Sequence, residues 1–213
     1  MERHIRELII DPAIQSLRLS ERLMQLRAGK DDALKPLPAL PFDMSSVQNI
    51  VRLSVTLEDF ATIQSNVASF HDTGWLDKEF IVAPTMTVAD LEVVVDILST
   101  APEKIHYLVR RTEIERHMRY SGDEIDLLGL YLQTGFNLGE EEFTYNRWML
   151  VNMSKPIDEY YTALDKNIMK KRPCIRSTKW WTDIRNFIEE RRPYRWSEAA
   201  IILLNVSHDE QVE

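Results

Sequence analysis

Met86-Thr-Val-Ala-Asp-Leu-Glu-Val-Val-Val-Asp-Ile-Leu98 is the stretch of sequence that indicates the fold most directly. Thr87 and Asp90 have the spacing of a capping box, with Asp in place of the usual Glu, in which two side chains bond the free amides at the start of a helix. Apolar residues follow at helical spacing: Val88, Leu91, Val95 and Leu98. The stretch therefore predicts an amphipathic helix with one buried face.

Two strands and a helix are predicted before this stretch. Residues 51–58 alternate between apolar and polar side chains, which is typical of a half-buried strand. Its apolar face carries Val51, Leu53, Val55 and Leu57. Phe80–Ala83 is a second, short strand that Pro84 ends. Between the strands, Asp59 is expected to cap a helix that ends at Gly74 and has one apolar face: Phe60, Ile63, Val67 and Phe70.

The N-terminal part is predicted to be a helix followed by a linker. In residues 1–29, Pro12 after Asp11 suits a helix start, and apolar residues recur at approximately helical spacing: Leu17, Leu19, Leu23, Met24 and Leu26. Residues 30–46 contain Pro36, Pro38 and Pro41 and are interpreted as a linker or an extended wrap.

Most of the chain after Leu98 is predicted to be helical. Helices are expected to start at Pro102, Asp123 and Pro156, over residues 178–192, and at a cap on Ser197. The Pro102 helix is expected to expose four arginines: Arg110, Arg111, Arg116 and Arg119. The Asp123 helix should end at Gly139. Residues 143–152 predict a strand that is apolar on both faces.

The order of these elements predicts the α+β class, rich in helices, with about three short strands and seven or more helices. Three regions are expected: residues 1–46 as N-terminal helix and linker, 47–165 as the α+β core, and 166–213 as a basic helical part packed on it. The only cysteine, Cys174, excludes an intrachain disulfide and suits a reducing compartment. We therefore expect a cytoplasmic protein, without a signal peptide or membrane span.

Charge is distributed unevenly along the chain. The segment Lys166–Arg195, here called the basic segment, holds ten Lys or Arg and three acidic residues, so its net charge is +7. Because the whole chain carries −8, the remainder carries −15. Cations that alternate with aromatic rings suit nucleic acid, since cations contact phosphates and rings stack on bases. The candidate nucleic-acid-binding residues are Lys170, Lys171, Arg172, Arg176, Lys179, Trp180, Arg191, Arg192 and Arg195.

A structural interpretation of the same segment remains open. The helix over residues 178–192 could bury Trp181, Ile184 and Ile188 and dock its basic face on the acidic body. In that case the cations would neutralise carboxylates of the same chain and would not be available to phosphates.

Searches for catalytic, cofactor and metal motifs identify no candidate residue. The six glycines form neither a dinucleotide-binding fingerprint nor a P-loop, and the five histidines lack metal-site spacing. Asp123, Glu124 and Asp126 could surround a cation, but an acidic first helical turn is the simpler interpretation. No acidic residue stands two positions before a lysine, the pattern of restriction-endonuclease-like sites. We predict no catalytic residue, metal or cofactor for this chain.

Several stretches resemble a pattern found in longer, mostly uncharacterised bacterial proteins: Val51–Phe60, Met86–Leu98, Ile105–Arg111, Gly122–Leu128, Pro156–Tyr161 and Arg195–Glu198. In that family, these stretches follow a nuclease-related, restriction-endonuclease-like domain. The resemblance spans residues 47–205 and implies a C-terminal region of such a protein, or a form without nuclease activity, because the acidic-x-lysine pattern is missing.

Three functions follow from these observations. The first is a non-catalytic accessory or interaction domain of a bacterial nuclease-like or DNA-associated protein, with nucleic acid bound through residues 166–195. The second is a protein-interaction or homo-oligomerisation module that uses residues 1–29 and 197–205. The third is an enzyme with an unfamiliar small-molecule site around Asp123, Asp126, His106 and Arg110.

Overall fold

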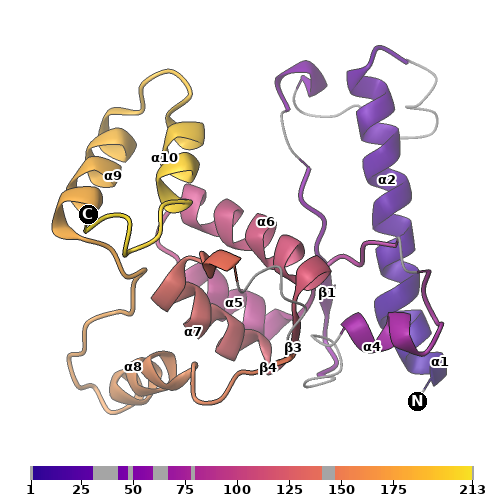
Figure 1. Ribbon diagram of the computed structural model, residues 1–213, viewed down its shortest axis with the longest axis horizontal. Helices are drawn as coiled ribbons and strands as arrows, with labels where there is room; N and C mark the ends of the chain where they lie inside the picture. The colour runs from indigo at the N-terminus through magenta and orange to yellow at the C-terminus, as the bar shows by residue number, and fades with distance from the viewer. Residues whose placement is uncertain are drawn as a thin grey trace.

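The computed structural model describes residues 2–30, 43–47, 50–59, 67–77, 80–140 and 147–212 (Figure 1). Helices dominate these residues, and four strands of three residues each form two small parallel sheets. The predicted α+β, helix-rich class is confirmed. Among the described helices, none combines the length and the apolar character needed to cross a membrane.

Three consecutive helices form the centre of the molecule: α5 (Val88–Ile97), α6 (Ala101–His117) and α7 (Glu124–Thr134). Their inner faces build the main hydrophobic core, in which Tyr107, Leu128, Tyr131 and Phe136 are buried. The rings of Tyr107 and Tyr131 meet edge to face at 5.1 Å. Aromatic packing of this kind adds to the stabilisation from buried apolar area.

Local capping fixes where these helices begin. Thr87 accepts a hydrogen bond from the Asp90 amide and Asp90 bonds back to the Thr87 amide, so the predicted capping box is confirmed. Thr100 and Glu103 form a second box before α6. The buried face of α5 agrees with the prediction in part. Leu98 is buried as expected, but Val88 and Val95 are exposed, and Val94 and Ile97 are buried in their place.

The first sheet pairs β1 (Ser54–Thr56) in parallel with β2 (Thr85–Thr87), with Val55 opposite Met86. The predicted alternation has the wrong phase in β1: Ser54 and Thr56 are buried, while Val55 and Leu57 are 48% and 90% exposed. The predicted strand at 80–83 is also wrong, since pairing starts after it, where the Ser54 amide donates to the Pro84 carbonyl. Proline supplies an acceptor but no donor, so it stands just outside the ladder.

The second sheet pairs β3 (Arg119–Ser121) with β4 (Arg147–Met149), also in parallel. Sequence periodicity did not predict β3. The strand predicted over residues 143–152 is described only from residue 147, and its first part lies outside the described residues. A side chain at Gly122 would come within 2.8 Å of Leu150, so the approach of these two segments depends on glycine.

The N-terminal helix is continuous in space but changes type along its length. It runs from α1 (Glu2–Ile5) through a π-helical turn (Arg6–Ile10) into α2 (Asp11–Arg27). Pro12 lies in the first turn of α2, as predicted, although helical residues of other types precede it. Because proline has no amide proton to donate, the wider turn before it lets the helix pass without the usual hydrogen bond.

A second hydrophobic cluster anchors this helix. Ile5, Ile9, Ile10 and Ala13 pack with buried residues near α4 (Val67–Asp72) and before β2: Phe70, Leu76, Val82 and Ala83. Arg52 reinforces the contact by donating to the carbonyls of Ala13 and Ile81, at 3.3 and 2.6 Å. The expected stripe farther along α2 is not buried, with Leu19 and Met24 about half exposed. The helix start predicted after Asp59 falls on residues 60–66, which lie outside the described residues.

Helix α7 ends earlier than predicted. Gly135, at φ 62°, is its C-cap, and Gly139 lies beyond the helix. Inside α7, a side chain at Gly129 would lie 2.0 Å from the Met153 carbonyl oxygen, so the backbone before α8 (Lys155–Asp165) rests directly on α7. Helix α8 confirms the helix predicted at Pro156.

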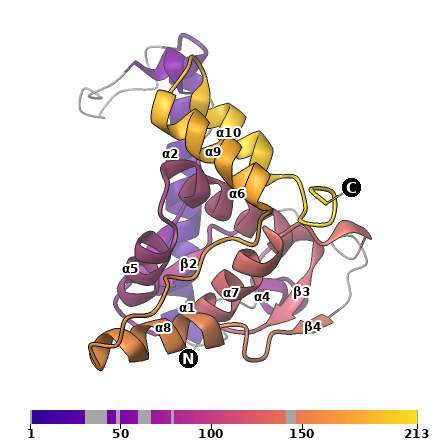
Figure 2. The ribbon, with the colours of Figure 1, turned by 90° about the vertical axis from the view of Figure 1, so that its left-hand side faces the viewer.

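The C-terminal part consists of α9 (Lys179–Arg191), α10 (Trp196–Leu204) and a short tail. Figure 2 shows the two helices side by side as a hairpin at one end of the molecule. Helix α10 contacts both α9 and α6, so it lies between α9 and the core. Ser197 does not cap α10, which starts at Trp196 after Arg195 in a left-handed conformation.

Candidate interaction surfaces

The basic segment consists of two parts with different charge. Residues 166–178, here called the α8–α9 connection, hold five cations and no acidic residue. Helix α9 holds three cations and three acidic residues and is therefore neutral overall. The positive charge is thus concentrated in the connection, which carries +5, and in Arg192 and Arg195 of the α9–α10 turn, which carry the remaining +2.

Three cations of the basic segment pair with carboxylates of the body. The Lys170 ammonium lies 2.6 Å from Glu159, and Arg172 lies 3.1 Å from the Asp96 carboxylate. Arg185 pairs with Glu103 at 3.2 Å, with both side chains largely buried. These contacts match the structural interpretation of the segment in part. The candidate residues Lys170 and Arg172 fasten the connection to the body.

Other candidate cations have partners within the C-terminal part. Lys179 pairs with Asp183 at 2.7 Å and Arg195 pairs with Glu198. The Arg191 guanidinium lies 4.6 Å from the centre of the Phe187 ring, and Arg192 lies 5.3 Å from that of Trp196. Guanidinium groups in such positions are attracted to the negative face of the ring and remain open to further contacts.

Lys166, Lys171 and Arg176 are exposed, and no ion pair joins them to any residue within the described parts of the chain. Lys166 also lines an open groove beside α8, about 520 Å³ in volume, together with Lys155 and Lys170. Asp158 and Glu159 line the same groove, so it is cationic by only one charge. Of these three lysines, Lys170 alone was a predicted site residue, so the groove does not gather the predicted cations.

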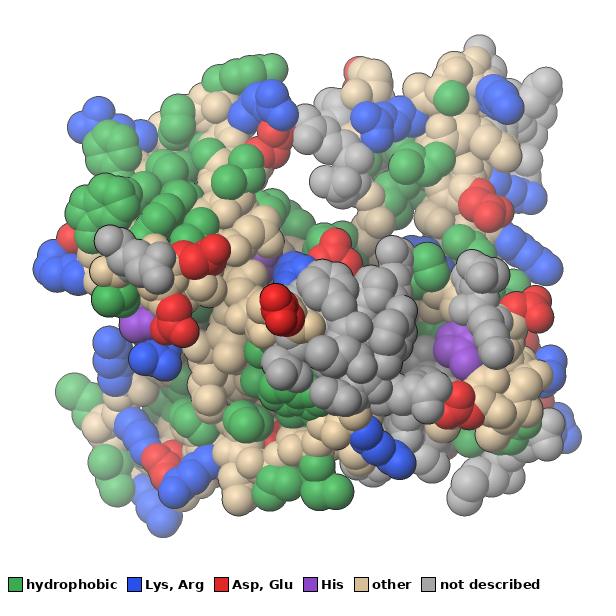
Figure 3. Space-filling model, viewed as in Figure 1, with side chains coloured by type: hydrophobic (Ala, Val, Ile, Leu, Met, Phe, Trp, Pro, Cys, Tyr) green, Lys and Arg blue, Asp and Glu red, His purple; other side chains and the backbone are tan. Residues whose placement is uncertain are grey.

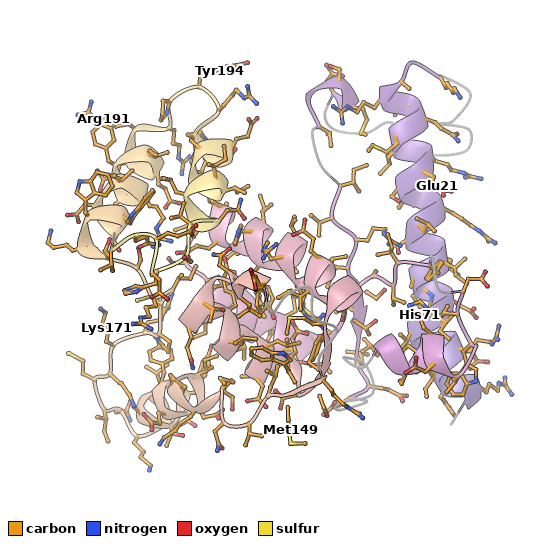
Figure 4. All side chains as sticks on the ribbon, in the orientation of Figure 1. Glu21, His71, Met149, Lys171, Arg191 and Tyr194 are labelled. Carbon is orange, nitrogen blue, oxygen red and sulfur yellow. The ribbon has the colours of Figure 1, made fainter. Side chains whose placement is uncertain are left out.

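The outer face of α9 carries exposed aromatic rings. Trp180 is 65% exposed and Phe187 is 54% exposed, and Tyr194, in the turn that follows, is 95% exposed. In Figure 3 hydrophobic side chains gather over the region where Figure 1 places α9. Figure 4 shows Arg191 and Tyr194 at the tip of the hairpin, at the other end of α9 from Lys171. Among the predicted site residues, Trp180 and Arg191 belong to this face.

The inner face of α9 packs on α10. Trp181, Ile184 and Ile188 are half-buried there, whereas the structural interpretation expected them to be buried. Thr178 caps the helix by accepting from the Trp181 amide at 3.4 Å. With the inner face held against α10, the rings on the opposite side point away from the protein.

A polar cluster attaches the hairpin to the body. His106 on α6 contacts the Tyr131 hydroxyl at 2.9 Å through Nδ1 and the Asn205 side-chain oxygen at 3.0 Å through Nε2. Burial lowers the pKa of His106 to about 4, so the imidazole is neutral at pH 7. A neutral ring that donates to Asn205 and accepts from Tyr131 satisfies both partners.

Arg111 is fully buried, which contradicts its predicted place on the outer face of α6. Its guanidinium lies 3.1 Å from Glu124 and also pairs with Glu115. Burial opposes the charge of Arg111, yet Glu115 and Glu124 raise its pKa. Glu124 also accepts a hydrogen bond from Tyr107. Through these contacts the cluster links α6 to α7.

The residues proposed for a small-molecule site have separate partners. Asp123 caps α7 by accepting from the Asp126 amide at 2.7 Å. Asp126 accepts from the Ser154 amide at 2.9 Å, so both carboxylates bind backbone amides of the chain. Arg110 binds Glu113 and the Phe136 carbonyl. No group of three His, Cys, Asp or Glu within the described residues is arranged to hold a metal ion.

Comparison with family models, with curated proteins and with solved structures found no match to this chain.

Proposed function

We propose that this chain is an interaction domain that acts by binding a protein partner through the outer face of α9 and the turn after it. One observation supports the proposal above the others: two large aromatic residues stand exposed on one side of a helix whose opposite side is packed, and a third stands exposed in the turn that follows. Aromatic residues and arginine are the types enriched in protein interfaces and among their energetic hot spots.

The charge of this surface favours protein over nucleic acid. Helix α9 is neutral, and Asp183 is on the aromatic side, 57% exposed in its side chain. The turn adds Arg192 and Arg195, of which Arg195 is paired with Glu198. The Asp183 carboxylate would repel a phosphate backbone, whereas a protein surface can pair with it. Removing the exposed rings of Trp180, Phe187 and Tyr194 from water would favour a complex.

The experiment uses the full chain as bait in an extract of the cells that encode it. Wild-type protein, Phe187→Glu and a control, Leu57→Glu, are immobilised in parallel. Leu57 is an exposed leucine outside the hairpin, so its substitution adds the same charge away from the proposed surface. We expect a specific protein, or the chain itself, on wild type and control but not on Phe187→Glu. Equal retention by all three would contradict the proposal.

Nucleic-acid binding is a second candidate, favoured by the acid-free α8–α9 connection and its exposed Lys166, Lys171 and Arg176. In a bacterial nuclease-related protein, the relationship that the sequence resemblance suggests, such a domain would be a cytoplasmic accessory part that binds without cutting. Its support is smaller, because Lys170 and Arg172 of the same connection are already paired with the body.

This candidate is tested by titrating single- and double-stranded DNA at low and moderate salt. Replacing Lys166, Lys171 and Arg176 by Ala should weaken binding at least tenfold and reduce the salt slope by about 2–3. The matched control replaces Arg18, Arg22 and Arg27 on α2, which removes the same charge elsewhere. Absence of binding at low salt, or equal loss in both triple variants, would rule the candidate out.

A further inference from the structure

The outer face of α9 has a symmetric pattern centred on Phe187. Trp180 is seven residues before Phe187 and Tyr194 is seven residues after it. Seven residues correspond to about two helical turns, so Trp180 and Phe187 lie on one side of α9, with Tyr194 following in the turn. Asp183 and Arg191 stand four residues before and after Phe187, on the same side. Aromatic residues thus repeat symmetrically, while the two charges are opposite in sign.

Such a pattern is complementary to itself when two copies of α9 lie antiparallel. Each residue then faces the one that is equally far from Phe187 on the other side. Phe187 faces Phe187, Asp183 faces Arg191, and Trp180 comes next to the turn that carries Tyr194. A parallel pair would instead set Asp183 against Asp183 and Arg191 against Arg191, which is repulsive. Of the two arrangements, only the antiparallel one sets Asp183 against Arg191.

We propose that the partner of this surface is a second copy of the chain, bound through an antiparallel pair of α9 helices with a two-fold axis at Phe187. The inference rests on the proposed function and specifies its partner. A two-fold axis needs one patch that is complementary to itself, and the outer face of α9 meets that condition.

The contacts that Asp183 and Arg191 make within one chain can be replaced by contacts with a second copy. Asp183 is paired with Lys179, whose side chain is 88% exposed, and pairs this exposed contribute little stability. Arg191 lies over Phe187 and remains exposed, so it can reach the Asp183 of another copy. In the pair Lys179 comes opposite Arg195. Arg195 keeps its partner Glu198, and Lys179, whose side chain is 88% exposed, can turn its ammonium group into the solvent.

The length of the contact between the two α9 helices limits the affinity of the dimer. Helix α9 has 13 residues and is therefore about 20 Å long. One helix pair of this length covers less surface than permanent dimers bury, so the dimer should be weak and reversible.

The charges provide a direct test by sedimentation of the full chain over a concentration series. Asp183→Arg alone places Arg against Arg in the dimer, and Arg191→Asp alone places Asp against Asp. Each variant should dimerise at least tenfold more weakly than wild type. Mixing the two variants restores both opposite-charge contacts, so the mixture should form a heterodimer with affinity near that of wild type. Thermal unfolding of each variant checks that the fold is intact.

The outcomes separate this inference from the proposed function. A chain that is monomeric throughout, or a dimer that Phe187→Glu and the charge variants leave unchanged, overturns the antiparallel pair. If the monomeric chain still captures a different protein through the outer face of α9, the proposed function stands without it. If it captures nothing and DNA binding is lost with the connection cations, both proposals fail and the nucleic-acid candidate replaces them.

Discussion

Arg111 and Glu124 form an ion pair that is removed from water, with Nη2 of Arg111 3.1 Å from the carboxylate and side-chain exposures of 0% and 1%. The pair joins the middle of α6 to the first residue of α7. Burying charge is costly, and such a pair is tolerated because Glu115 and Tyr107 supply further hydrogen bonds. It fixes how α6 and α7 align.

Removing the charge of Glu124 should therefore destabilise the fold. For Glu124→Gln we expect the free energy of unfolding to fall by about 3 kcal/mol, because Arg111 loses one of two buried counter-ions. The measurement is chemical denaturation at pH 7. Lys179→Met, which removes an exposed pair, is the control and should change the value by less than about 0.5 kcal/mol. Equal effects of the two substitutions would show that Arg111 does not depend on Glu124.

His106 makes stability depend on pH in a defined direction. Its pKa is about 4 in the fold and about 6.5 in the unfolded chain. Because the unfolded state takes up the proton first, the contribution is complete above pH 6.5 and is lost progressively as pH falls toward 4. From pH 7 to 5.5, wild type should lose about 1 kcal/mol more than His106→Gln. Parallel pH profiles of the two proteins would contradict this.

Helix propensity and steric overlap predict opposite effects on stability when Gly129 is replaced by Ala. Helix propensity alone predicts that Gly129→Ala stabilises α7 by about 1 kcal/mol. The new side chain would lie 2.0 Å from the Met153 carbonyl oxygen, however, and backbone cannot yield cheaply. We therefore expect a loss of about 2 kcal/mol or more, as in other overpacked sites. A variant that melts above wild type would show that the segment before α8 does not rest on α7.

Arg52 should control how firmly the N-terminal helix is held. Arg52 donates to one carbonyl of the helix and to one carbonyl of the segment before β2. In Arg52→Ala both carbonyls lose this donor and must bind water instead. Amide hydrogen exchange should become faster in residues 5–13 and remain unchanged in α7, which belongs to the other hydrophobic cluster. Faster exchange in both regions would indicate one cooperative unit instead.

Local sequence signals predicted the helices well because caps act over three or four residues. Thr87 with Asp90 and Thr178 with the α9 amides needed no information from distant parts of the chain. The phase of β1 could not be obtained in this way, because its partner β2 determines which side is covered. The burial of Arg111 likewise depends on Glu124, which lies 13 residues farther along.

The candidate surface was predictable in part. The sequence identified the basic segment and its aromatic residues, but it did not show that Lys170, Arg172 and Arg185 pair with the body. Those partners are distant in sequence. Phe187 and Tyr194 were missed as site residues, although the seven-residue steps from Trp180 to Phe187 and from Phe187 to Tyr194 were visible in the sequence. The spacing indicates a surface only once the three side chains are known to be exposed.

The most direct test of the α9 surface is fluorine NMR of protein in which all five tryptophans are fluorinated, recorded over a concentration series. Trp180→Phe assigns the Trp180 signal. If copies meet through α9, the Trp180 signal shifts as concentration rises, while Trp75 and Trp148, which lie outside the hairpin, keep their positions. A Trp180 signal that stays constant, or shifts confined to Trp75 and Trp148, would contradict association through this face.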